Sequence, residues 1–242
     1  RSQALLGAGR WRPGARRRAG REAAGATPGE VAARHEHANS EYRATVEEAA
    51  GRYQALLANE IEDVLGALEA AFERRETPAA PIDCVGDAAS VVLQLPPLSA
   101  VPDARPVVPR KGKATLQPRS DSERHGLYLS VLASNVLGLV RQSLATAPGL
   151  REIRVVAVRP SAALQSGHTL EAVYAGSFDA GEMSQVSWAT IDPVSSVTGA
   201  TGHLLRLAGD GEVVALDLGD EPELSAVLDA LHAALNPGPG AP

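Results

Sequence analysis

Apolar residues that recur at steps of three and four predict a long amphipathic helix in the first third of the chain. The periodic apolar positions are Val46, Ala49, Tyr53, Leu56, Leu57, Ile61, Val64, Leu68 and Phe72. Charged residues fill the other side, which is typical of a helix with one buried face. Thr27, Pro28 and Glu30 have the spacing of a capping box with proline at the first helical position. We therefore expect a helix over residues 27–77.

The length of this helix leaves two arrangements open. A straight helix of about 35 residues runs about 50 Å, which exceeds the diameter of a small domain. Either the helix bends onto the rest of the chain, or residues 46–72 pair with a second copy as a coiled coil. The second arrangement makes the chain a homo-oligomer.

The remaining apolar runs predict strands around one central helix. Ser120 and Glu123 form a second capping box, and the helix that follows to about Ala145 is apolar on nearly every side. Asp192 and Pro193 are expected to start a short helix. The expected strands are 89–95, 152–159, 169–178 and 185–191, and the expected hairpin joins 203–208 to 212–218. The six prolines between residues 96 and 118 are expected to prevent regular strand pairing.

These elements give an α+β class: a long N-terminal helix, then a mainly antiparallel sheet packed with a central and a C-terminal helix. The C-terminal helix is expected to begin at Asp220 and Glu223, which have capping-box spacing. The expected organisation is a disordered basic arm (1–26), a coiled-coil-like helix (27–77), a strand with a Pro-rich connector (78–119), an α+β domain (120–236) and a linker-like tail (237–242).

Charge is distributed unevenly along the chain. The whole sequence carries −6, whereas residues 1–22 hold seven arginines and one acid, or +6, which leaves −12 for the rest. A second basic segment contains Arg110, Lys111, Lys113, Arg119 and Arg124. Because an extended basic segment can follow a phosphate backbone, these five residues are the candidate nucleic-acid contacts.

No pattern in the sequence points to catalysis, a cofactor or a metal. The phosphate-binding loop, the dinucleotide fingerprint and the serine nucleophile elbow are all missing. His35 and His37 lie two apart on a helix and so point to different sides. Cys84 lies between Asp83 and Asp87, whose negative charges raise the pKa of a thiol and so argue against a nucleophile.

The chain has one cysteine and no apolar run long enough to span a membrane. These two features favour a cytoplasmic protein without a membrane span.

The middle of the chain resembles a known family. The run ASVVLQLPPLSAVPD at 89–103, the segment 122–158, Ser177 and the Ile-Asp-Pro-Val at 191–194 are similar to an accessory region of actinobacterial Mrr-type restriction endonucleases. The resemblance covers roughly residues 40–195. It implies a module placed before a nuclease domain, in a restriction or defence system, and it carries no catalytic residue.

The sequence differs from that family in the residues that hold the catalytic metal. The family's nuclease domain uses an Asp and a Glu-x-Lys to hold a divalent metal. The two lysines here are Lys111 and Lys113, and no acid lies two residues before either. The nuclease domain is therefore absent from this sequence, and the resemblance implies a nuclease partner in cis or in trans.

Two function classes stay open. The first is a non-catalytic accessory module of a restriction or defence-type system that acts through protein–protein or DNA-backbone contacts. The second is a self-associating interaction scaffold unrelated to DNA. A hydrolase built on scattered carboxylates is a third and weaker hypothesis.

Overall fold

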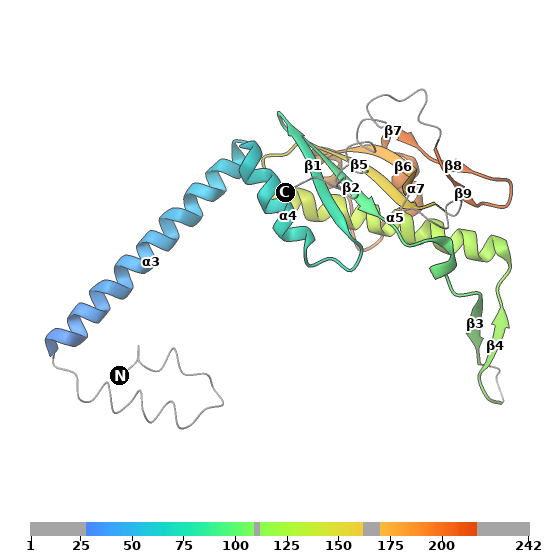
Figure 1. Ribbon diagram of the computed structural model, residues 1–242, viewed down its shortest axis with the longest axis horizontal. Coiled ribbons are helices and arrows are strands. Elements are labelled where there is room, and N and C mark those ends of the chain that lie inside the picture. The colour runs from blue at the N-terminus through green and yellow to red at the C-terminus, as the bar shows by residue number, and fades with distance from the viewer. Residues whose placement is uncertain (1–27, 109–111, 162–169, 217–242) are drawn as a thin grey trace, which may run out of the picture. The chain divides into compact units, whose positions relative to one another are not determined.

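The computed structural model describes residues 28–108, 112–161 and 170–216, and it forms two units that divide at residue 54. The α+β class is confirmed, because helices pack on one face of a mixed, mainly antiparallel sheet (Figure 1). The basic arm (1–26), the C-terminal helix and the tail (237–242) lie outside the described residues.

The predicted N-terminal helix is two helices, α3 (Pro28–Leu57) and α4 (Ile61–Phe72). The break is caused by Asn59, which has a φ of 57° and whose side-chain amide donates to the Gly149 carbonyl at 3.1 Å. A Cβ at Gly149 would lie 2.5 Å from the Leu56 carbonyl oxygen, so this approach requires glycine. The prediction of one continuous helix to residue 77 is therefore wrong.

A five-stranded sheet follows, with the strand order β1-β2-β5-β6-β7. β2 and β5 are parallel, and the other neighbours are antiparallel. Because parallel neighbours need a crossover, α5 (Asp121–Thr146) makes the connection between β2 and β5. The strands are β1 (Ala79–Val85), β2 (Ala88–Gln94), β5 (Glu152–Pro160), β6 (Leu170–Asp179) and β7 (Thr201–Leu204).

β1 is not among the expected strands, because Pro78 and Pro81 disfavour a strand in the interior of a sheet. The strand lies at the edge of the sheet and its register shifts between Pro81 and Asp83. Edge strands and bulges are where a sheet accepts proline.

The Pro-rich connector contains a strand pair, so the expectation that its prolines prevent pairing is wrong. η1 (Leu98–Ala100) is followed by β3 (Ala104–Val107), which pairs antiparallel with β4 (Thr115–Pro118). In a two-stranded ribbon each strand has one free edge, so a missing proline N–H costs no hydrogen bond there. Figure 1 shows this ribbon apart from the main sheet.

The strand predicted at 185–191 is also wrong. Asp179 accepts from the Glu182 amide at 2.9 Å and starts α6 (Ala180–Ser184), after which the chain continues in turns. Trp188 lies under the Arg141 guanidinium, 5.3 Å from the ring centre. The short helix α7 (Pro193–Thr198) is capped by Asp192 as predicted, and β8 (Arg206–Leu207) pairs with β9 (Val213–Val214) in the predicted hairpin.

One face of the sheet and the helices α4 and α5 enclose the main core. α5 begins with the predicted capping box, in which Ser120 and Glu123 bond to each other's backbone amides. By length and composition α5 is apolar enough to cross a membrane, yet many of its apolar side chains are buried against the sheet. The core residues that these two helices contribute include Val64, Leu68, Phe72, Tyr128, Leu132, Val136, Leu139 and Val140.

Candidate functional site

The described members of the basic segment lie in the loop before β4, between β4 and α5, and in the first turn of α5. Lys113 is exposed, whereas Arg119 and Arg124 are half-buried. Arg105, on the neighbouring β3, adds a further cation to this region. Arg110 and Lys111 lie outside the described residues. The structure thus brings Arg105, Arg119 and Arg124 to one region without forming an open row of free cations.

Two acids at the start of α5 neutralise part of this positive charge. Glu123 Oε1 lies 3.0 Å from Arg105 Nη1, and Asp121 Oδ1 lies 3.9 Å from Arg124 Nη1. The Ser120 backbone amide lowers the pKa of Glu123, and Arg105 and Arg119 lower it further. A phosphate would have to compete with these carboxylates for the arginines, which weakens the case for a DNA site.

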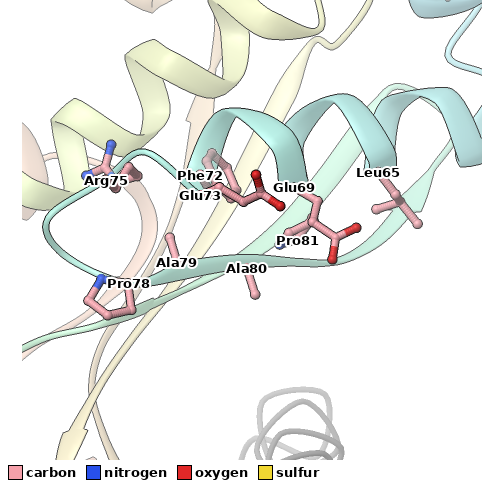
Figure 2. A pocket seen from close by; sticks show the side chains of 9 residues that line it. All are labelled: Leu65, Glu69, Phe72, Glu73, Arg75, Pro78, Ala79, Ala80 and Pro81. Carbon is pink, nitrogen blue, oxygen red and sulfur yellow. The ribbon is translucent and has the colours of Figure 1, made fainter.

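A pocket of about 600 Å³ lies between α4 and β1 (Figure 2). Its apolar wall includes Leu65 and Phe72, and Glu69 and Glu73 add carboxylates on the α4 side. Arg75 also lines the pocket, but its guanidinium donates to Gln142 Oε1 at 2.7 Å and burial lowers its pKa. The pocket therefore fits an apolar group that carries a positive charge.

The other sequence candidates for chemistry are separated in the structure. His35 contacts Asn39 at 3.0 Å, whereas His37 contacts Glu41 at 3.2 Å, so the two rings have different partners as the helical spacing predicts. Cys84 is 1% exposed, and burial followed by the charge of Asp83 raises its pKa. The predicted direction of that pKa shift is confirmed.

One group of polar side chains was missed by the sequence reasoning. His125, in the first turns of α5, is buried and meets Asp210 and Glu212 from the β8–β9 hairpin. The ligand atoms of these three residues all lie within 4.8 Å of one another. His125 lies 85 or more positions before both acids in the chain, so no spacing signal could have revealed the group. The only available signal was the predicted hairpin, which carries Asp210 in its turn and Glu212 at the start of its second strand.

No family model, no curated protein and no solved structure matches this chain. The resemblance to Mrr-type accessory regions therefore stays a prediction, and function has to be argued from the geometry above.

The lowered pKa of Glu123 predicts a specific pH dependence of stability. A carboxyl group whose pKa is lower in the folded state stabilises the fold above its unfolded pKa, about 4.3, and this stabilisation is lost as the pH falls through the folded pKa. Glu123→Gln should therefore be less stable than the parent chain at pH 6, and the difference should vanish toward pH 3. Urea unfolding at each pH measures this, and a difference that is constant from pH 6 to pH 3 would contradict it.

Proposed function

We propose that this chain is a non-catalytic interaction module that self-associates through α3. The observation that carries the proposal is that α3, 30 residues long, has no buried residue. Helices draw most of their stability from packing an apolar face, and isolated helices are marginal in water. A helix of this length whose residues before Ala55 are almost all exposed is expected to find its apolar contact in another molecule.

The apolar positions of α3 have the spacing of a coiled-coil seam. Tyr42, Val46, Ala49 and Tyr53 follow one another at steps of four, three and four. Tyr42 is 70% exposed, Val46 48% and Tyr53 52%. A heptad seam packs best against a seam of the same period, and a second copy supplies one by two-fold symmetry. We therefore choose a second copy of this chain as the partner.

This proposal narrows the segment first expected to self-associate. Residues 46–72 include Val64, Leu68 and Phe72 of α4, and these side chains are buried in the core of their own chain. The seam that stays available lies on α3, over residues 42–53.

The proposal predicts that charges in the seam separate the copies without unfolding either. Val46→Glu combined with Tyr53→Glu should convert an oligomer into a monomer in light scattering, because each introduced carboxylate would have to be buried in the contact. Ala44→Glu, which places the same charge on the opposite side of α3, is the matched control and should leave the mass unchanged.

The urea midpoint of the Ala55–Pro242 unit should be the same in all three proteins at a concentration where each is monomeric. Val64→Glu, by contrast, should unfold this unit, because Val64 is fully buried. A parent chain that is monomeric at every accessible concentration would refute self-association.

A setting in a restriction or defence system, with a nuclease partner in cis or in trans, is the second part of the proposal. It is supported by the resemblance over residues 40–195 alone. A cytoplasmic location likewise stays a prediction.

Contact with DNA backbone is the second candidate function, and the gathering of arginines where β4 meets α5 favours it. Changing Arg110, Lys111, Lys113, Arg119 and Arg124 to Ala should weaken binding to every duplex alike. It should also flatten the plot of log affinity against log salt concentration by up to about 4.5 units, at about 0.9 per lost contact. Fluorescence anisotropy with a labelled duplex measures both effects.

The matched control replaces Arg74, Arg151 and Arg206, which lie outside this segment, and should leave the salt slope unchanged. If the parent chain shows no duplex binding at about 50 mM salt, where electrostatic binding is strong, the DNA candidate is lost.

A further inference from the structure

The turn of the β8–β9 hairpin holds two carboxylates against a buried histidine. His125 is 7% exposed, and its Nδ1 lies 3.5 Å from Asp210 Oδ2 and 3.4 Å from the Asp210 carbonyl oxygen. Glu212 completes the group, in which all three ligand atoms are within 4.8 Å of one another. One imidazole and two carboxylates thus converge on one point.

The hairpin backbone fixes the direction of the Asp210 side chain. Gly211 has a φ of 85° and its amide donates to the Ala208 carbonyl at 2.9 Å, while the Ala208 amide donates to the Glu212 carbonyl at 2.8 Å. The Glu212 amide donates to Asp210 Oδ1 at 3.2 Å. Because Oδ1 is occupied within the turn, Oδ2 is the oxygen that faces His125.

The hairpin is itself anchored, so the carboxylates are not on a free loop. Val213, the residue after Glu212, is 1% exposed and belongs to the main core. His125 lies on α5, whose burial fixes the other side of the site. Both halves of the group are therefore positioned by the same core.

The distances allow the three residues to share one metal ion. Ligands placed about 2.1 Å from a tetrahedral zinc ion are about 3.4 Å apart, close to the 3.5 Å that separates His125 Nδ1 from Asp210 Oδ2. We propose that His125, Asp210 and Glu212 bind a zinc ion, with water as the fourth ligand.

The donor set and the charge agree with this choice of metal. Neutral imidazole with carboxylate oxygens suits zinc, and two carboxylates balance its double positive charge. Glu212 is only partly buried, and its carboxylate lies within 4.8 Å of the ligand atoms of His125 and Asp210. The bound ion would connect the β8–β9 hairpin to α5 through His125 and Asp210, which are 85 positions apart in the chain.

The test is a zinc titration of the full-length protein after removal of metal with EDTA, followed by competition with a chromophoric chelator. We expect one zinc ion per chain and a melting temperature that rises with zinc concentration, because the ion binds only the folded state. Asp210→Asn and Glu212→Gln should each weaken zinc binding by about 100-fold, since loss even of a group that only orients a ligand costs 10–100-fold.

His37→Ala is the matched control, because it removes an exposed histidine that faces a carboxylate, Glu41, outside the proposed site. This variant should bind zinc as tightly as the parent. The two carboxylate variants carry the test because they change surface positions, whereas His125→Ala removes a buried side chain and risks unfolding. Zinc binding that survives in the Asp210→Asn/Glu212→Gln double variant, or no binding in the micromolar range, would overturn the proposal and leave a simple His125–Asp210 ion pair.

Discussion

The burial of α5 against one face of the sheet is the interaction on which the rest of the Ala55–Pro242 unit depends. α5 connects the two parallel strands β2 and β5, and its side chains Leu132, Val136 and Val140 are fully buried. α4 packs on the same core through Leu68 and neighbours. Through its first turns, α5 also positions His125 and the acids Asp121 and Glu123, which lie beside Arg124 and Arg105 respectively. The core and both polar clusters of this unit therefore share one helix.

The sequence predicts the elements whose signals are local. The Ser120–Glu123 capping box, the Asp192 cap and the apolar runs of β2, β5 and β6 all appear as expected, because each depends on neighbours in the chain. The helix break at Asn59 could not be predicted in this way, since it depends on a contact with Gly149, 90 positions away. The errors at β1, β3 and β4 share another cause: proline excludes a central strand, but it is compatible with an edge.

The candidate sites follow the same division. Clustered basic residues are visible in the sequence, and the contact of Arg124 with Asp121 is local, but the pairing of Arg105 with Glu123 depends on how β3 meets α5. The group of His125, Asp210 and Glu212 is a tertiary feature, because a hairpin turn meets a helix that precedes it by 85 positions. The sequence pattern left open whether the N-terminal helix packs on its own chain or pairs with a second copy. The structure shows that α4 buries an apolar face in its own chain, whereas α3 has no buried residue.

The central claim is that the α4–β9 core is stable within one chain, whereas α3 obtains its stability from a second copy. Hydrogen exchange of the backbone amides at low and at high protein concentration tests this claim most directly. The account predicts that protection of the α3 amides rises with concentration, while the α5 amides are strongly protected at both concentrations. Protection of α3 that is the same at both concentrations would contradict it.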